Sequence, residues 1–192
     1  MDQQEKPVVS IHDVDRYFEQ QVSTYQHELY TYALHLTHHS QDAEDIFQEA
    51  IVRAYVAMKS YSLQEIQVLR PRPWLYKIMT NVFLNTQRVQ KPVLTPFFIS
   101  EESQEMNIED DWRERPDVVV ETAEQLQQLN NLVERLPGRF RAAILLYFFQ
   151  GFSYAEIAET LGQPLNTVKA NLSHGKQLLR QAILAQKAME GK

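Results

Sequence analysis

The sequence predicts an all-α fold made of two small helical domains joined by an acidic linker. Apolar residues recur three and four positions apart along most of the 192 residues, which is the spacing of amphipathic helices. Only 5 glycines occur, and no Asn-Gly or Asp-Gly pair separates alternating strands. Prolines and acidic residues break the helical periodicity between about residues 92 and 116. We therefore expect one domain over residues 1–91, a linker over 92–116 and a second domain over 117–192.

The composition excludes several classes of protein. Hydrophobic residues make up 44% of the chain, which is enough to build cores. The absence of cysteine excludes disulfides and thiolate zinc sites. The N-terminus has no basic segment followed by an apolar one, and no apolar run reaches the roughly 20 residues of a membrane span. These features predict a cytoplasmic protein, and nothing in them indicates a cofactor.

The charge is distributed unevenly around a formal total of −6. Residues 1–100 hold 9 Lys and Arg against 11 Asp and Glu, a net of −2. Residues 101–124 hold 2 against 10, a net of −8, and residues 125–192 hold 8 against 4, a net of +4. The acidic segment is either a solvated spacer or a segment with a role in a basic channel. The C-terminal domain is locally basic, which suits contact with nucleic acid.

The first two helices are expected at Asp13–Thr37 and from Asp42 onward. The first has an apolar inner side formed by Phe18, Val22, Tyr25, Leu29, Tyr32, Ala33 and Leu36. The second begins at Asp42, a good N-cap residue. Its first turn holds Glu44 and Asp45, whose charges suit the positive end of the helix dipole.

The second helix has two different faces at 100° per residue. One face consists of Ala43, Phe47, Ala50, Ala54 and Ala57, and the other of Asp45, Gln48, Glu49, Val52 and Val56. The second face is either a solvated surface or a protein-docking patch, because exposed valines beside charges suit docking. The periodicity alone leaves both interpretations open.

The third helix is expected from Trp74 to about Val89, with Pro73 near its first position. Its inward side consists of Leu75, Ile78, Val82 and Val89. Its outward side consists of Lys77, Thr80, Asn81, Leu84, Gln87 and Arg88, with Trp74, Tyr76 and Phe83 beside it. Cations and aromatic rings on one face suit single-stranded nucleic acid, although aromatic residues at helical spacing are more often core.

The C-terminal half predicts a helix-turn-helix. A helix over Glu121–Leu136 ends at Pro137 and Gly138, and the very apolar helix "RFRAAILLYFFQ" follows. Ser153 and Glu156 then form a capping box, Gly162 ends that helix, and "GQPL" is a suitably short turn.

The last helix separates buried and polar residues. Its buried stripe consists of Val168, Leu172, Gly175, Leu179 and Ile183, and the opposite face of Asn166, Ala170, Ser173, His174, Gln177 and Gln181. Lys169, Lys176 and Arg180 lie along one flank. Small polar groups can contact base edges while cations contact phosphates, so this helix suits the major groove.

Three segments in this order resemble the sigma-70 family, and specifically its two-domain extracytoplasmic-function (ECF) sigma factors. "YALHLTHHSQDAEDIFQEAIVRAYVAM" is similar to region 2.1–2.2 of the family, and "PWLYKIMTNVFLNTQRVQK" to region 2.3–2.4. "LPGRFRAAILLYFFQGFSYAEIAETLGQPLNTVKANLSHGKQLLRQAI" is similar to region 4. The resemblance spans nearly the whole chain after the first dozen residues.

The resemblance implies a transcription initiation factor that binds core RNA polymerase and promoter DNA. The residues it places on the largest-subunit clamp helices are Asp42, Asp45, Gln48, Glu49 and Val52. Those it places on the −10 element are Trp74, Tyr76, Lys77, Thr80, Asn81, Leu84 and Arg88. Those it places on the −35 element are Asn166, Thr167, Lys169, Ala170, Asn171, Ser173, His174, Lys176 and Arg180. The polymerase flap and an anti-sigma factor are further candidate partners, and the acidic linker would enter the polymerase active-site channel.

The chain departs from the family pattern in its basic residues. Asn171 and His174 stand where relatives often have Arg, and Asn85 stands where they often have an acidic residue. The arginine-rich run after the third helix is reduced to Arg88 and Lys91. These differences bear on promoter sequence and melting strength more than on the fold. Fewer phosphate contacts should also flatten the salt dependence of binding.

Two other classes of protein explain part of the sequence. A helix-turn-helix repressor or activator with a helical sensor domain accounts for residues 125–192, but not for the acidic face of the second helix. An enzyme would need a catalytic site. The best candidate in the sequence is a metal site formed by His35, His38, His39, Asp42, Glu44 and Asp45. Imidazoles at a helix end are more often polar surface, and no Gly-rich phosphate loop occurs, so we expect no enzyme activity.

Overall fold

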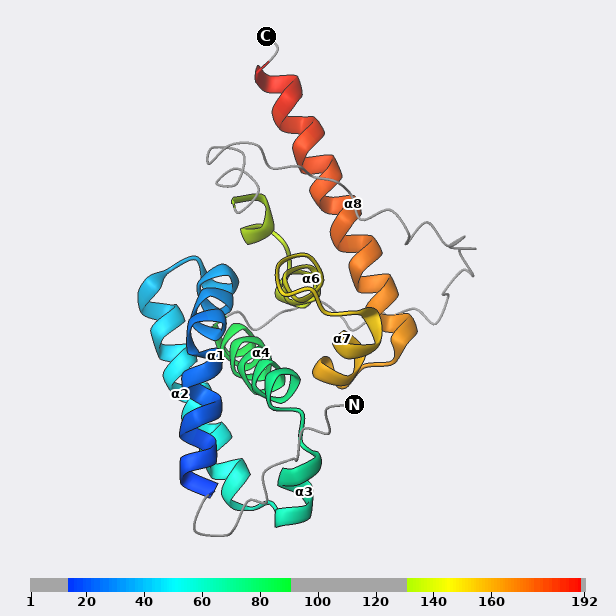
Figure 1. Ribbon diagram of the computed structural model, residues 1–192. Coiled ribbons are helices and arrows are strands. Elements are labelled where there is room, and N and C mark those ends of the chain that lie inside the picture. The colour runs from blue at the N-terminus through cyan, green and yellow to red at the C-terminus, as the bar shows by residue number, and fades with distance from the viewer. Residues whose placement is uncertain (1–13, 91–130, 191–192) are drawn as a thin grey trace, which may run out of the picture.

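The structure is a computed structural model that describes residues 14–90 and 131–190. All regular elements in these two stretches are helices, which confirms the all-α fold class (Figure 1). They are α1 (Val14–Thr37), α2 (Ser40–Lys59), α3 (Leu63–Val68), α4 (Pro71–Gln90), α6 (Gly138–Ile144), the π-helix η3 (Leu145–Phe149), α7 (Tyr154–Leu161) and α8 (Leu165–Glu190). Residues 131–134 are also helical. The expected linker, and most of the helix expected over 121–136, lie outside the described residues.

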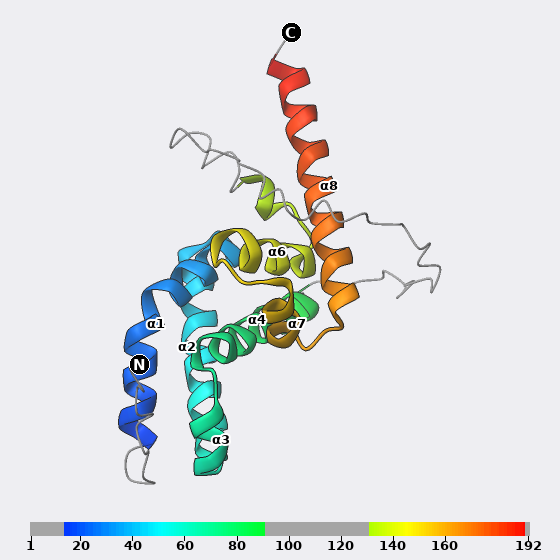
Figure 2. The ribbon, with the colours of Figure 1, turned by 45° about the vertical axis from the view of Figure 1, so that its right-hand side comes forward.

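Helices α1 to α4 form the N-terminal bundle, in which α1 and α2 pack side by side and α4 lies against both (Figures 1 and 2). The connection between α1 and α2 is very short and turns at His38, which has a φ of +62°. Histidine is one of the residues that adopt this left-handed conformation more often than most. The buried residues of α1 include the expected Phe18, Leu29, Tyr32, Ala33 and Leu36.

The start of α2 differs from the sequence prediction. The helix begins at Ser40 rather than after Asp42, and its N-cap residue is His39, whose side chain makes no capping hydrogen bond. Asp42 therefore lies in the first turn, where its charge still suits the helix dipole. The buried face also shifts by about one residue, because Ile46 and Met58 are buried in place of Phe47 and Ala57.

The sequence prediction missed the short helix α3. Ser62 is its N-cap, and a capping box joins the Ser62 side chain to the Glu65 backbone N–H and the Glu65 side chain to the Ser62 N–H. Ile66 anchors α3 in the core. α4 then begins at Pro71, two residues earlier than expected from Pro73, since proline is well tolerated in the first turn of a helix.

Helices α6, η3, α7 and α8 form the C-terminal domain, which has the predicted helix-turn-helix. The expected capping box is present: Glu156 N–H donates to Ser153 Oγ, and Ser153 N–H donates to the Glu156 carboxylate. Gly162 ends α7 with a φ of +61°, which glycine adopts without strain. At Gly175 of α8, an added Cβ would lie 2.8 Å from Cγ1 of Ile144, so glycine is what allows α8 to approach α6.

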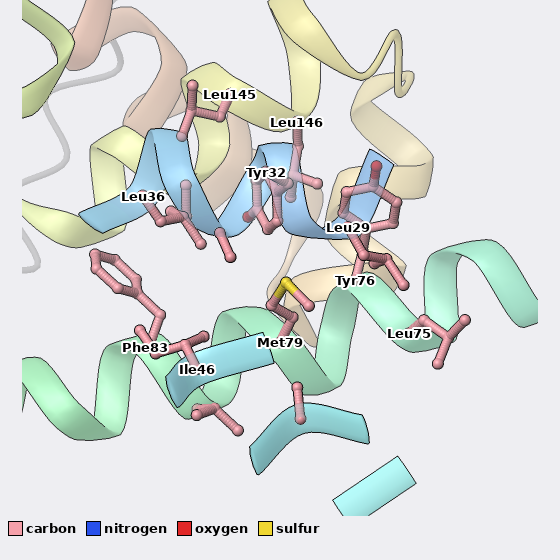
Figure 3. Close-up of a cluster of buried hydrophobic side chains, with 14 of the residues drawn as sticks. Leu29, Tyr32, Leu36, Ile46, Leu75, Tyr76, Met79, Phe83, Leu145 and Leu146 are labelled. Carbon is pink, nitrogen blue, oxygen red and sulfur yellow. The ribbon is translucent and has the colours of Figure 1, made fainter. Parts of the chain in front are cut away.

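The N-terminal bundle and the C-terminal domain share one apolar core. Leu145 and Leu146 of η3 are fully buried and lie over the α1 residues Tyr32 and Leu36 (Figure 3). Helix α4 contacts α6 and α7 as well as α1 and α2. The C-terminal half of α8, in contrast, extends away from the rest of the molecule in both views (Figures 1 and 2).

Candidate nucleic-acid interface

The outer face of α2 carries acidic, amide and apolar side chains together. Its exposed residues are Asp42, Asp45, Gln48, Glu49, Val52 and Val56. Val52 is 59% exposed and Val56 64%, so neither belongs to the core. Glu49 pairs with Arg53 within the helix, with Oε1 and Nε 2.6 Å apart. Branched side chains exposed beside the carboxylates of Asp42 and Asp45 suit a docking face.

The exposed part of α4 is smaller than the sequence predicted. Lys77 and Asn81 are exposed, whereas Trp74 and Leu84 are half-buried. The Arg88 side chain lies outside the described side chains. The Trp74 indole N–H donates to the Tyr61 hydroxyl at 3.2 Å, which fixes its ring at the edge of the bundle. The solvent-facing polar surface of α4 is therefore centred on Lys77 and Asn81.

Thr80, which the sequence placed on the outer side of α4, and Tyr76, which it placed beside that side, are in the core instead. Thr80 is fully buried; its hydroxyl lies 2.8 Å from the Tyr32 hydroxyl and donates to the Tyr76 carbonyl oxygen at 2.8 Å. Tyr76 is also fully buried, and its hydroxyl donates to Gln150 Oε1 at 2.5 Å. Burial of Thr80 is tolerated because its polar atom is hydrogen-bonded. In this arrangement neither residue faces solvent.

The polar face of α8 is mostly where the sequence placed it. Its exposed residues are Asn166, Lys169, Ala170, His174, Gln177, Arg180 and Gln181. Of the other residues expected at the −35 element, Thr167, Ser173 and Lys176 are half-buried and Asn171 is buried. Nζ of Lys176 lies 5.5 Å from the ring centre of Tyr147 and 5.6 Å from that of Phe148. Ile183, expected in the buried stripe, is 37% exposed, because α8 has by then left the body of the domain.

Asn171 does not belong to the exposed face of α8. Its side chain is buried, and its amide Nδ2 donates to Gln163 Oε1 at 3.1 Å across the turn between α7 and α8. Asn171 therefore fixes the turn that presents the first residues of α8. The sequence analysis did not single out Gln163, since a turn residue with an amide side chain has no distinctive pattern.

The capping box also orients α7 for a contact with the N-terminal bundle. The hydrogen bond from the Ser153 N–H is the main cause that lowers the pKa of Glu156, and the Ser153 hydroxyl and Arg70 add to it. Arg70 donates to Glu156 at 2.9 Å and to Glu159 at 3.1 Å. The sequence analysis gave Arg70 no role, because its partners lie more than 80 residues away.

Arg72 makes a second connection between the two halves. It donates to Glu28 Oε2 at 3.1 Å and to the Gln150 carbonyl oxygen at 3.0 Å. Its guanidinium lies 4.7 Å from the ring centre of Phe152. Phe152 in turn packs edge-on against Tyr76, with ring centres 5.2 Å apart. The start of α4 is thus clamped onto the segment that leads into α7.

Both halves of the chain match known families. Residues 21–92 match sigma-70 region 2, and residues 126–179 match sigma-70 region 4. The chain belongs to the sigma-70 family. Region 2 corresponds to the N-terminal bundle, which includes the acidic outer face of α2, and region 4 contains the helix-turn-helix. As a sigma factor, the chain is a transcription initiation factor that directs RNA polymerase to promoters.

Relatives of this chain include ECF sigma factors of two bacteria. ECF RNA polymerase sigma factor SigE of Mycolicibacterium smegmatis is 30% identical over 152 residues, which are 79% of this chain and 56% of that protein. ECF RNA polymerase sigma factor SigW of Bacillus subtilis is 28% identical over 169 residues, which are 84% of this chain and 86% of SigW. The chain thus spans little more than half of SigE but most of SigW.

Two solved structures share the fold of this sigma factor. One is the sigma factor RpoE in complex with the anti-sigma factor NepR from Bartonella quintana, with a TM-score of 0.60 and 21% identity over 88% of this chain and 97% of that one. The other is CnrH in complex with the cytosolic domain of CnrY, with a TM-score of 0.59 and 17% identity over 91% of this chain and 95% of that one. At these identities the likeness concerns the fold.

The described residues also bear on the metal site considered above. Within residues 14–90 and 131–190, no three His, Asp or Glu side chains gather closely enough to hold a metal ion. The His35 ring instead packs against Phe149 of the C-terminal domain, and Glu134 and Arg141 of that domain influence the pKa of His38. No helix in the described part of the chain combines the length and apolar content that crossing a membrane would require.

Proposed function

We propose that this sigma factor docks on the clamp helices of core RNA polymerase through the outer face of α2. The observation that carries the proposal is the exposure of Val52 and Val56 beside Asp45 and Glu49 on one helix face. The core of a protein interface needs apolar surface, and a charged rim steers association. Asp42 and Gln48 extend the same face, so they belong to the proposed contact.

The proposed promoter contacts follow the exposed polar faces of α4 and α8. Lys77 and Asn81, with the half-buried Trp74 and Leu84, form the surface proposed for the −10 element. Stacking rings and cations are what single-stranded DNA requires. Of the other residues expected there, Tyr76 is covered by Gln150 and Phe152 of the C-terminal domain and would contact DNA only if the two halves separate, whereas Thr80 is hydrogen-bonded to Tyr32 within the N-terminal bundle and is not part of the proposed surface.

On α8 the proposed contacts divide by chemistry. Asn166, Ala170, Ser173 and His174 would contact base edges of the −35 element, with Thr167 at the start of the helix. Lys169, Lys176 and Arg180 would contact phosphates, which position the helix without specifying sequence. Asn171 is instead proposed to act through Gln163.

Co-elution with purified core polymerase, together with run-off transcription, tests the docking face. We expect Asp45→Arg to weaken binding to the core enzyme about tenfold, or about 1.4 kcal/mol, because it reverses a charge in the interface. Gln48→Ala should weaken binding less. The matched control is Glu19→Arg, an exposed charge reversal on α1. Unchanged co-elution of Asp45→Arg with core polymerase would rule out this face.

The same experiment separates the proposal from a stand-alone helix-turn-helix regulator. Such a regulator would bind duplex DNA without polymerase and would not co-elute with the core enzyme. A sigma factor should co-elute and permit run-off transcription from a cognate promoter. Binding of α8 to duplex alone should be weak, since polymerase raises its effective concentration at the promoter.

An anti-sigma factor is a further proposed partner. The support is that the two solved structures described above are complexes, one of a sigma factor with an anti-sigma factor and the other of CnrH with the cytosolic domain of CnrY. The cytosolic helical domain encoded beside this gene, where there is one, is the candidate to purify. It should inhibit run-off transcription in proportion to its concentration, and excess core polymerase should relieve the inhibition.

A further inference from the structure

The packed arrangement holds the two proposed DNA surfaces close together. A Cβ added to Gly162, in the helix-turn-helix turn, would lie 4.0 Å from Nζ of Lys77 on α4. The −10 and −35 elements are about 25 base pairs apart, which is roughly 85 Å at 3.4 Å per base pair. One rigid body with adjacent surfaces cannot contact both. If the proposed function holds, the two halves separate at a promoter, and the contacts between them control that step.

The end of α1 makes one of these contacts. The His35 ring packs against Phe149 of η3, with ring centres 5.2 Å apart. The Arg141 guanidinium of α6 donates to the carbonyl oxygen of Leu36 at the end of α1. Arg141 also donates to the carbonyl oxygens of Glu134 and Leu136 within its own domain. This cation therefore joins the C-terminal end of α1 to the C-terminal domain.

Two imidazole nitrogens at this contact are buried and lack a hydrogen-bond partner in the described part of the chain, namely Nδ1 of His35 and Nε2 of His38. A neutral imidazole tolerates one such nitrogen as a bare acceptor. A protonated imidazole makes both nitrogens donors, and a buried donor without a partner costs free energy. The contact therefore suits the neutral form of both rings.

Burial dominates the pKa of both rings, and the charges around His38 act in both directions. Burial lowers the pKa of His35 and is also the main cause that lowers the pKa of His38. At His38, Glu134 has the largest charge effect and raises the pKa, whereas Arg141, His35 and His39 lower it. Glu134 is exposed, so water screens its effect. The Arg141 cation remains beside His38 at every pH in question.

We propose that His35 and His38 form a proton-sensitive latch, which holds the C-terminal domain against the N-terminal bundle at neutral pH and releases it in acid. The packed arrangement binds fewer protons than the separated one, because both pKa values are lower when the rings are buried. Packing is thus fully favoured above the ordinary histidine pKa of 6.5 and weakens as the pH falls below it.

Three other contacts between the halves do not titrate in this range. The Arg70 pair with Glu156 stays ionised, because the pKa of Glu156 is lowered. Arg72 donates to a backbone carbonyl of Gln150, and Tyr76 to the Gln150 side chain. Burial raises the pKa of Tyr76, so it stays neutral. A loss of packing between pH 7 and 5 would therefore come from the two histidines.

Energy transfer between two fluorophores measures the packing without polymerase or DNA. The chain has no cysteine, so Glu19→Cys on α1 and Gln177→Cys on α8 provide two unique, exposed labelling sites. Titration from pH 7.5 to 5 should lower the transfer efficiency, with a midpoint below 6.5. Far-UV circular dichroism at each pH should stay helical, which distinguishes separation from unfolding.

The decisive comparison is a double variant, His35→Phe with His38→Asn. Phenylalanine keeps a ring against Phe149, and asparagine adopts the positive φ of position 38 more readily than most residues. This variant should keep high transfer down to pH 5. His27→Gln, an exposed histidine of α1, is the matched control and should follow the parent protein. The latch is refuted if the parent shows no pH dependence, loses its helices together with transfer, or is matched by the double variant.

Transcription distinguishes failure of the latch from failure of the proposed function. Run-off transcription by the parent protein at neutral pH depends on the docking and promoter faces and not on the histidine titration. Loss of transfer in acid without any promoter-dependent transcription would leave the latch intact and contradict the proposed function. Promoter-dependent transcription without pH-dependent energy transfer would support the proposed function and contradict the latch.

Discussion

Helices α4 and α8 each have a predicted DNA-contacting face, and the two faces differ in how many of their residues are exposed to solvent. Most of the α8 residues expected there are exposed, and Asn171 is the one that is buried. On α4 the same kind of pattern includes Tyr76 and Thr80, which are fully buried. The difference follows from the neighbours: α8 packs on α6 and α7, whereas α4 contacts α1, α2, α6 and α7. Periodicity identifies one outer face only where a helix has neighbours on one side.

The strongest test of this difference compares two adjacent residues of α4. Tyr76→Ala should lower the free energy of unfolding by about 3–5 kcal/mol, because it leaves a cavity in the core that both halves share. Lys77→Ala should change stability by less than about 0.5 kcal/mol and should weaken −10 DNA binding by polymerase holoenzyme. Urea titration and open-complex footprinting measure the two effects. A small loss of stability for Tyr76→Ala would show that the buried side of α4 is assigned wrongly.

The features that were predicted correctly are local in sequence. The Ser153–Glu156 capping box and the Gly162 helix end depend on residues three or four positions apart, so the chain order alone specifies them. The burial of Thr80 depends on the Tyr32 hydroxyl, which is 48 residues away. Arg70 likewise gains its role from Glu156, 86 residues later. No pattern within one helix contains that information.

The start of α2 was also predicted imprecisely, but the error is smaller. Asp42 is a good N-cap residue, yet the helix begins at Ser40 after an uncapped His39. The turn at His38, with its positive φ, sets where the helix begins. The candidate docking face is unaffected, because its residues are spaced along the middle of the helix. Here the error concerns a boundary and leaves the orientation of the helix intact.

Gly175→Ala tests the buried side of α8. An added Cβ would lie 2.8 Å from Cγ1 and 3.1 Å from Cδ1 of Ile144, so α6 and α8 would have to move apart. Overpacking of this kind costs about 1–3 kcal/mol. Thermal unfolding should show the loss, and Ala182→Gly, on the half of α8 that extends from the domain, should cost no more than its helix propensity of about 1 kcal/mol. Equal losses for the two would mean that α8 does not pack tightly at Gly175.

The exposed side of α8 is tested by two substitutions with different expected signatures. Lys169→Ala should weaken −35 binding by a similar factor on every sequence and reduce the salt slope by about 1. Asn166→Ala should change the preferred base at one position, at a cost of about 1–3 kcal/mol on the preferred site. Binding of holoenzyme to a library of −35 sequences at two salt concentrations measures both. Identical profiles for the two variants would mean that α8 presents another face to DNA.

The smallest expected effect concerns Asn171, which is the buried residue among the DNA contacts expected on α8. Asn171→Leu removes the hydrogen bond to Gln163, and a double-mutant cycle with Gln163→Leu should give a coupling of about 0.5–1.5 kcal/mol in the free energy of unfolding. If Asn171 acts only by fixing the turn, its substitution should weaken binding to all −35 sequences without changing their order. A change of base preference at one position, with no coupling to Gln163, would instead make Asn171 a direct contact. Because the residue is buried and its amide is engaged within the helix-turn-helix, we expect the first result.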